Sequence, residues 1–513
     1  MIRKAADIKL KVLPVYAAAE HLYYYEGPCR FGQGEALQPG FDGIMTAQMI
    51  SDYNAKLKEI APEGVEIMDH ILLKRTDNWD NNEAMYDEFA SVAAEADVFF
   101  AMNRIAVDDL MEEFLTRFPK TTVFNPHGSF SSTVHYASLK AYNPDYEFIA
   151  PITWETTIKI LRTLRARKVI HNTRILCITR FGSNTSFSSV DAFHNQEDIA
   201  RRLGVRFRFV NLHEFFEDLH PALPEGNITT PGRETWNIDD NDMAEVKKIT
   251  DELISGAENN YMDREQLEKS VKAFVLVRKL MDFKDCNGFT VPCPDACSTR
   301  RLNEIGFTFC LTHSLNMEDQ IPSACEYDTA AVVSQQMLIA VSGKSPYMGN
   351  TIPVVYEDGQ FAPNFALEQE EIDKLLATGD TSNIYYTQHS VSGRNYHNDN
   401  KGGKYDLRPF ALDQGFGATL KYDFDQDKGQ VLTLCRISPD GKKLFIGKGE
   451  IICSGGMNRG NCSHSVFYRV KDQYNTYVNQ RITGNHVSLV YGDYTDELSH
   501  LADMLGLEKY IAE

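Results

Sequence analysis

An acidic pair opens the stretch of sequence best suited to chemistry, "SACEYDTAAVVSQQMLIAVSGKSPYMGN", which covers Ser323 to Asn350. Glu326 lies where a strand is expected to end and a helix to begin. A carboxylate there is stabilised by the positive end of the helix, by about 0.3–1 kcal/mol. Asp328 fits an ordinary helix-capping acid. A Glu beside apolar residues at the end of a parallel strand usually faces a cleft, so we take Glu326 as the candidate functional carboxylate.

Three histidines could join such a carboxylate. His486, in "TGNHVSLVYGDY", stands directly before an apolar strand, whereas His389 and His397, in "TQHSVSGRNYHN", lie in a polar loop. They form no HExxH or similar compact metal motif, and spacing alone cannot bring together residues so far apart in the chain. A structural role and a role in a site therefore both stay open for each of them.

The ten cysteines are scattered through the chain without a repeated spacing. This usage is typical of reduced thiols in a cytoplasmic protein. Cys293 and Cys297, in "CPDAC", stand alone as a pair, so they indicate a zinc site only weakly.

The elements that must position these residues change in character along the chain. Strand-like and helix-like segments alternate through residues 1–168 and again through 169–352, which predicts two Rossmann-like, doubly wound α/β domains with parallel sheets. Short alternating runs with Gly and Asp-Gly turns follow in 353–513 and predict a C-terminal antiparallel β-rich, barrel-like domain. The second domain would carry Glu326 and Asn350, and the third would carry His389 and His486.

Polar loops follow other predicted strands: "MNR" at 102–104, "NPHG" at 125–128 and "RFGS" at 180–183. Ligands bind at such strand ends in parallel sheets. The third loop lacks the glycine spacing of a phosphate-binding loop, so it gives only weak support for a phosphate role.

Two blocks, the stretch from Ser323 to Asn350 and "TGNHVSLVYGDYTDELSHLADMLG", resemble the L-fucose isomerase and L-arabinose isomerase superfamily. The resemblance implies that Glu326 is both metal ligand and catalytic base, and that His486 is a metal ligand. It also implies that His389 and Asn485 help to bind a sugar. Two α/β units followed by a β-rich domain are the domain order of that family.

One position departs from the family pattern. The second acidic ligand of the family, 24 residues after the first, falls on Asn350 (350 − 326 = 24). An Asn carbonyl can still ligate a hard cation such as Mn²⁺, the first expectation, or Mg²⁺. It cannot accept a proton as a general base. A shift of the loop that brings in Glu357 or Asp358 fits the spacing less well.

The resemblance implies metal-dependent aldose–ketose isomerisation through an enediol, with metal ligands Glu326, Asn350 and His486. Because Asn350 replaces an acid, a second hypothesis is different carbohydrate chemistry on the same scaffold, such as glycoside cleavage, epimerisation or lyase action. A third is a sugar-binding protein without catalysis, against which the retention of both Glu326 and His486 argues.

The composition excludes several partners. The 513 residues carry a net charge of −20, and this argues against a nucleic-acid or anionic membrane surface. No apolar run is long enough to span a membrane, and the N-terminus does not resemble a signal peptide. The family resemblance implies a homo-oligomer, a trimer or hexamer, in which loops near Arg104 and His127 could reach a neighbour's pocket.

Overall fold

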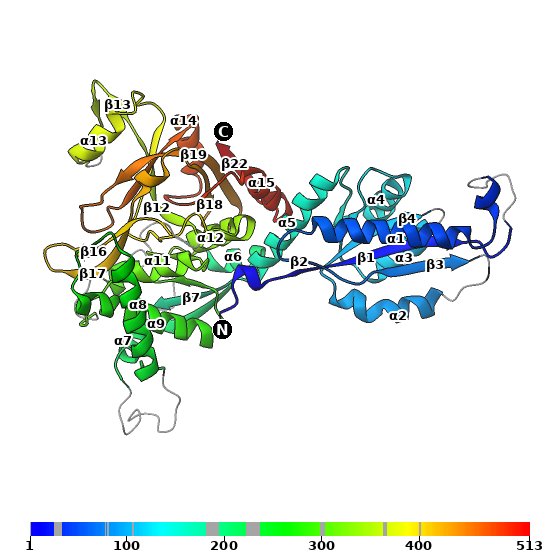
Figure 1. Cartoon of the computed structure of the whole chain (residues 1–513), viewed down its shortest axis with the longest axis horizontal. Coiled ribbons are helices and arrows are strands. Elements are labelled where there is room, and N and C mark those ends of the chain that lie inside the picture. The colour runs from blue at the N-terminus through cyan, green and yellow to red at the C-terminus, as the bar shows by residue number, and fades with distance from the viewer. Residues whose placement is uncertain are drawn as a thin grey trace. The chain divides into compact units, whose positions relative to one another are not determined.

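The computed structural model describes residues 2–24, 33–76, 78, 82–104, 107–180, 194–221, 236–297, 303–362, 367–399 and 402–512. The chain divides into two compact units (Figure 1). One comprises Ile8–Arg165, and the other comprises Met1–Asp7 together with Ala166–Glu513. The three-domain division at residues 168 and 352 stays a prediction.

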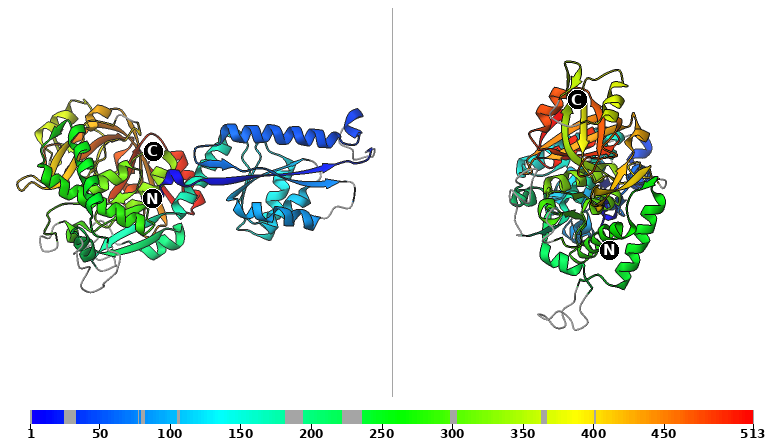
Figure 2. Two further views of the ribbon diagram at one scale, coloured as in Figure 1. Left: turned by 60° about the horizontal axis from the view of Figure 1, so that its bottom comes forward. Right: turned by 90° about the vertical axis from the view of Figure 1, so that its left-hand side faces the viewer.

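The unit Ile8–Arg165 is built on a parallel sheet. Its strand order is β2-β1-β4-β5-β6, and β3 pairs with the second half of β1. Helices α1 and α2 lie on opposite faces of this sheet (Figures 1 and 2). Aromatic and aliphatic side chains from β1, β4 and α3 form its core. The elements are β1 (Leu10–Glu20), α1 (Phe41–Ile60), β2 (Val65–Ile67), β3 (Ile71–Thr76), α2 (Asn82–Glu95), β4 (Val98–Arg104), α3 (Asp108–Arg117), β5 (Thr121–Phe124), α4 (Phe130–Tyr142), β6 (Phe148–Ile149) and α5 (Trp154–His171).

A second parallel sheet opens the other unit, with the order β11-β10-β7-β8. Its core is filled by the apolar stripe of α9, by α8 and by aromatic residues near α11. The elements are β7 (Arg174–Thr179), α6 (Gln196–Leu203), β8 (Arg206–Asn211), α7 (Leu212–Asp218), α8 (Asp240–Gly256), β9 (Asn259–Asn260), α9 (Arg264–Phe283), β10 (Gly288–Thr290), α10 (Cys293–Ala296), α11 (Cys310–Glu318), β11 (Ser323–Ala324) and α12 (Thr329–Ser342).

The C-terminal part forms a closed antiparallel barrel. Its six strands follow the order β18-β21-β12-β15-β20-β19, and pairing of β18 with β19 closes the ring. The strands are β12 (Tyr347–Val354), β15 (Ile384–Gln388), β18 (Val431–Ile437), β19 (Lys443–Gly455), β20 (Ser465–Val470) and β21 (His486–Tyr491). Around the barrel lie β13 (Tyr356–Glu357), β14 (Gln360–Phe361), α13 (Gln369–Leu376), β16 (Tyr405–Ala411), β17 (Phe416–Tyr422), α14 (Gln473–Gln480), α15 (Thr495–Met504) and β22 (Glu508–Ala512). The predicted fold class is confirmed: parallel α/β sheets are followed by an antiparallel barrel.

Helix α12 joins the second sheet to the barrel. It contacts β10 and β11 on the sheet side and β12, β18 and β21 on the barrel side. Its residues are buried almost throughout, which fits a sequence whose apolar residues lie on all sides of the helix rather than along one stripe. The start of α12 therefore lies where sheet and barrel meet. Among the helices of the described residues, none is long and apolar enough to cross a bilayer.

Candidate metal centre

Glu326 occupies the turn between β11 and α12, at the carboxyl edge of the parallel sheet. Both Glu326 and Tyr327 have φ = +59°, a left-handed conformation that costs a non-glycine residue about 1–3 kcal/mol. The turn is held by two backbone hydrogen bonds. Tyr327 N–H donates to Val291 O at 3.0 Å, and Asp328 N–H donates to Cys325 O at 3.1 Å. This unusual backbone points the Glu326 carboxylate toward the barrel.

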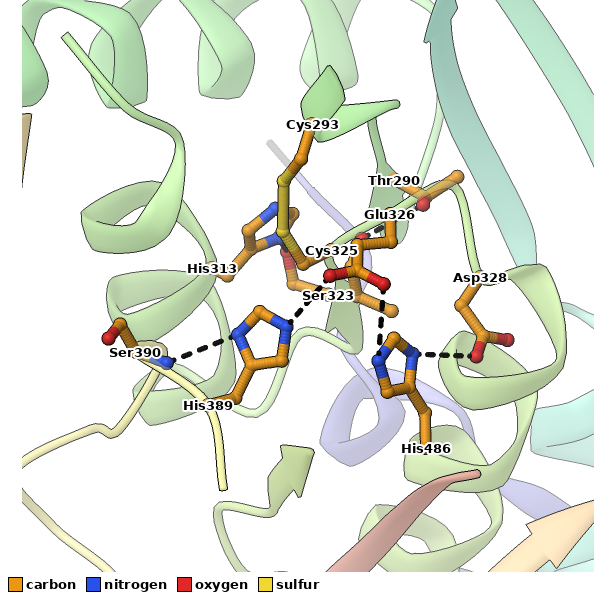
Figure 3. The surroundings of a disulfide bond; sticks show 11 residues. Thr290, Cys293, His313, Ser323, Cys325, Glu326, Asp328, His389, Ser390 and His486 are labelled. Carbon is orange, nitrogen blue, oxygen red and sulfur yellow. Dashed lines mark hydrogen bonds and ion pairs between the residues drawn. A yellow bond between two sulfur atoms is a disulfide. The ribbon is translucent and has the colours of Figure 1, made fainter. Parts of the chain in front are cut away.

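Two imidazoles from the barrel meet this carboxylate (Figure 3). Nε2 of His389 lies 3.5 Å from Oε1 of Glu326, and Nε2 of His486 lies 3.4 Å from Oε2. Both histidines are fully buried, and the Glu326 side chain is 17% exposed. One ligand atom from each of the three residues lies within 4.8 Å of the others. Two imidazoles and one carboxylate at this spacing are a donor set that suits divalent transition metals such as Mn²⁺.

Asp328 supports the site as well as capping the helix. Its Oδ1 accepts the Ala331 N–H at 2.7 Å, so the predicted capping role is confirmed. Its Oδ2 lies 3.0 Å from Nδ1 of His486 and accepts from Nη1 of Arg436 at 2.8 Å. His194 Nε2 is 3.2 Å from Oδ1. A carboxylate behind a ligating histidine fixes its tautomer and raises its basicity.

The sequence interpretation did not find His194 or Arg436. One signal for Arg436 was present: it is an arginine within the apolar strand "VLTLCRI", and a buried arginine requires a buried acceptor. Nothing in the local sequence indicated which acceptor that would be, because Asp328 is separated from Arg436 by 108 positions.

The hydrogen bonds place a proton on different ring nitrogens of the two histidines, on Nδ1 of His486 and on Nε2 of His389. Because Asp328 can only accept, Nδ1 of His486 donates to it, and Nε2 of the same ring faces Glu326. His389 has the opposite arrangement, since its Nδ1 accepts the Ser390 N–H at 3.1 Å. Its Nε2 therefore carries the proton and points it at Glu326. Nε2 of His486 is therefore the ring nitrogen left to face a metal, whereas Nε2 of His389 donates toward Glu326 in this arrangement.

Both carboxylates of the site are ionised near neutral pH. Burial alone would raise the pKa of Glu326, but the hydrogen bond from His389 and the charge of His486 lower it below its usual value. Burial also acts to raise the pKa of Asp328, and Arg436 and His194 overcome that effect and hold the pKa well below its usual range. The site therefore offers negative charge to a cation.

Asn350 lies beside this triad on β12. In the antiparallel pairing of β12 with β21, Asn350 is directly opposite His486. Its Oδ1 accepts a hydrogen bond from Nδ2 of Asn485. Asn485 Oδ1 in turn accepts from Thr351 N–H at 3.3 Å. The structure thus brings together Glu326, His389 and His486 as the metal-type group, with a bonded pair beside them: Asn350 within β12 and Asn485 just before β21.

The other candidate residues lie elsewhere. Glu357 is exposed on β13, and Asp358 follows it in the same hairpin turn, so neither belongs to the triad. His397 is bound to Asp427 at 2.7 Å near the surface. In the loop at 180–183, the residues from 181 onward lie outside the described part of the chain.

Arg104 and His127, the residues of the two polar loops expected near a neighbour's pocket, both belong to the unit Ile8–Arg165. Their surroundings differ. Arg104 bonds to the main chain and side chain of Asp42 and to Thr46. His127 is exposed, with φ = +80°.

The expectation of reduced thiols throughout is wrong at one place. Cys293 and Cys325 form a disulfide, with their Cα atoms 6.4 Å apart (Figure 3). The parallel pairing of β10 with β11 brings the residues after these strands within bonding range. The weak zinc expectation for Cys293 and Cys297 is wrong for the same reason, because the Cys293 sulfur is already bonded.

Known proteins share part of this sequence. The chain is similar to two sulfoquinovose isomerases. They come from Priestia aryabhattai and Priestia megaterium, and each is 23% identical over 381 residues, which cover 71% of this chain and 69% of the relative. No family model matches the chain.

Proposed function

We propose that this protein is a divalent-metal-dependent sugar isomerase that interconverts an aldose and a ketose through an enediol. The observation that carries the proposal is the triad of Glu326, His389 and His486, whose ligand atoms lie within 4.8 Å of one another. The similarity to sulfoquinovose isomerases supports both enzymatic activity and the sugar isomerase class. Within that class, the sulfonated sugar of these relatives is the first substrate to assay.

The side chains have complementary roles in this proposal. Glu326 and His486 would hold the metal ion, most favourably Mn²⁺, with the Asn350 carbonyl beside them. The bound metal would polarise the two oxygens of an opened sugar. Glu326 is ionised and can accept the proton from the carbon next to the carbonyl. His389 can donate its Nε2 proton to a sugar oxygen, and Asp328 keeps the His486 ring oriented.

Asn350 favours a second candidate function, different carbohydrate chemistry on the same site. An isomerase that uses two carboxylates needs an acid where this chain has an amide bonded to Asn485. In the isomerase proposal, His389 takes the place of that missing proton carrier. In the second candidate, Glu326 serves as general acid or base for glycoside cleavage, epimerisation or elimination.

The test combines metal analysis with two substrate panels. We expect stoichiometric Mn²⁺ and formation of ketose from a free aldose, sulfoquinovose included. Glu326→Gln should abolish both, whereas Glu357→Gln, the exposed acid after β12, should leave both unchanged. Turnover of glycosides that is insensitive to chelators would refute the isomerase and favour the second candidate.

Asn350→Asp separates the two candidates further. It should raise isomerase activity if the amide only weakens an isomerase site. It should lower the native activity if the amide belongs to a different reaction. The measurement is the initial rate on the best substrate of each panel at saturating Mn²⁺.

We also propose that the protein assembles as a homo-oligomer. Large apolar side chains on the unit Ile8–Arg165 are open to solvent, among them Phe130 at 96%, Ile44 at 71% and Ile152 at 70% exposed. Exposed large apolar side chains can belong to an interaction surface. Light scattering of the wild-type chain and of Phe130→Asp tests this. A monomeric wild type would refute it.

A further inference from the structure

The disulfide between Cys293 and Cys325 lies in the main-chain support of the candidate metal centre. Cys325 is bonded directly to Glu326 along the chain, and Cys293 is the first residue of α10. The bond therefore ties the turn that carries the carboxylate to the segment after β10. Figure 3 shows the disulfide beside the Glu326 carboxylate and its two histidines.

The turn held by this bond has a demanding conformation. Glu326 and Tyr327 are both left-handed, and neither is a glycine. Such residues persist only where the surroundings fix them. Besides the disulfide, the turn is held by the Tyr327 and Asp328 N–H groups and by Thr290, whose Oγ1 donates to Ala324 O at 2.8 Å. Arg436 and His486 also bond to the Asp328 carboxylate. Opening the disulfide removes the covalent bond from these contacts and leaves the hydrogen bonds in place.

The free thiols of the described residues are poorly suited to thiol–disulfide exchange. Cys177, Cys286, Cys297, Cys310, Cys435 and Cys453 are buried, and Cys462 is half-buried. Burial raises the pKa of Cys310 to about 11 and that of Cys286 to about 12. A protonated thiol is a weak nucleophile, so these groups exchange slowly. Cys293 is half-buried, whereas Cys325 is 1% exposed, so Cys293 is the more accessible residue of the pair.

We propose that the Cys293–Cys325 pair is a redox switch that sets the Glu326 carboxylate in its metal-binding position when oxidised and releases it when reduced. A small thiol such as glutathione is the reductant. Its thiolate attacks the Cys293 sulfur, the S–S bond breaks, and Cys325 leaves as a thiolate that takes up a proton. A second thiol attacks the mixed disulfide and releases Cys293. Two thiols are oxidised to one disulfide as the protein disulfide is reduced to two thiols.

The first measurement is independent of metal and of turnover. Protein purified without reductant should be lighter by two hydrogens than fully reduced protein, and a peptide map should show Cys293 joined to Cys325. Hydrogen exchange of the Tyr327 and Asp328 amides should become faster after reduction by a thiol that is then removed without air. Alkylation of both cysteines in untreated native protein would refute the proposal, as would unchanged exchange at these two amides.

The second measurement reads the metal centre and rests on the proposed function. Reduction should weaken Mn²⁺ binding, measured by calorimetry, by about five- to tenfold, as expected when a strained backbone is freed to relax. Oxidised glutathione should restore the affinity. Cys293→Ser should show the weaker affinity under all conditions. Cys297→Ala, a buried free thiol one helical turn away, should keep the full redox response.

Failure of this inference and failure of the proposed function can be told apart. If the protein turns over no sugar but its Tyr327 and Asp328 amides exchange faster after reduction, the redox switch is supported and the proposed isomerase function is refuted. If the protein is an active isomerase whose Mn²⁺ affinity and amide exchange are the same in both redox states, only the redox switch is refuted. Because the wild-type chain is reduced chemically, the result does not depend on whether a variant folds.

Discussion

Replacing Asp328 with asparagine separates the support of the site from its ligands. Asp328 and Arg436 are both fully buried, and Asp328 also accepts from His486. Removing one partner of a buried ion pair typically lowers the free energy of unfolding by about 3–5 kcal/mol. For Asp328→Asn we expect a loss of about 3 kcal/mol. The lower figure applies because Arg436 keeps its bonds to Thr483 O at 3.0 Å and His486 O at 2.6 Å.

The same change should weaken metal binding. Loss of the carboxylate behind a ligating histidine typically reduces metal affinity by about 10–100-fold. An Asn at position 328 can still cap α12 through its carbonyl, so the helix start should survive. Urea unfolding of the metal-free protein measures the change in the free energy of unfolding. Calorimetry with Mn²⁺ measures the change in metal affinity.

The pH dependence adds an internal check. The pKa of Asp328 is lower in the folded chain than in the unfolded chain, mainly because Arg436 and His194 outweigh the effect of burial. The stabilisation that ionised Asp328 gives the fold is therefore complete above the ordinary aspartate pKa of about 3.9. It is lost as the pH falls through the pKa that Asp328 has in the folded chain. The difference in unfolding free energy between wild type and Asp328→Asn should be constant near pH 7 and shrink below about pH 4.

Asp472→Asn is the matched control. Asp472 also caps a helix, α14, by accepting the Asn475 N–H at 2.8 Å, but it is exposed. This variant should change the unfolding free energy by less than about 0.5 kcal/mol. If Asp328→Asn behaved like the control in both assays, the coupling of Asp328 to Arg436 and His486 would be refuted.

Two further variants test the barrel. Gly349→Ala should prevent normal pairing of β12 with β15, because an added Cβ would lie 2.5 Å from Gln388 O; we expect a loss of about 2 kcal/mol or more in urea unfolding, and a neutral result would contradict the pairing. Lys421→Met should stabilise the protein at pH 6–7 by up to about 4 kcal/mol, since burial lowers the pKa of Lys421 to about 7 and a charged Lys421 destabilises the fold. This gain should shrink as the pH rises from 7 toward about 10.4, where the unfolded lysine also loses its proton, and a gain that is the same at pH 6.5 and pH 9.5 would show that Lys421 is not buried as described.

Local pattern predicted much of the fold. Alternating strands and helices gave the parallel sheets, and the Gly and Asp-Gly turns after residue 353 gave the antiparallel barrel. The position of Glu326 at a strand end also followed from local pattern, because a polar residue between an apolar strand and a helix has few other places to lie.

The assembly of the site could not be read from local pattern. Glu326 and His486 are joined by barrel closure, and only a resemblance to known isomerases suggested that they meet. Cys293 and Cys325 are 32 positions apart with no shared motif, so their disulfide depends on the pairing of β10 with β11. The proton on His389 depends on the Ser390 N–H, a main-chain group that no side-chain pattern specifies.

The closure of the barrel fixes when the site can first exist. Strand β21 begins at His486 and fits between β18 and β12, so it is inserted between two strands that precede it in the chain. The parallel sheet alone carries Glu326, whereas His389 and His486 both come from the barrel part of the chain. The candidate metal centre is therefore complete only once β21 has joined the barrel and placed His486 beside Glu326.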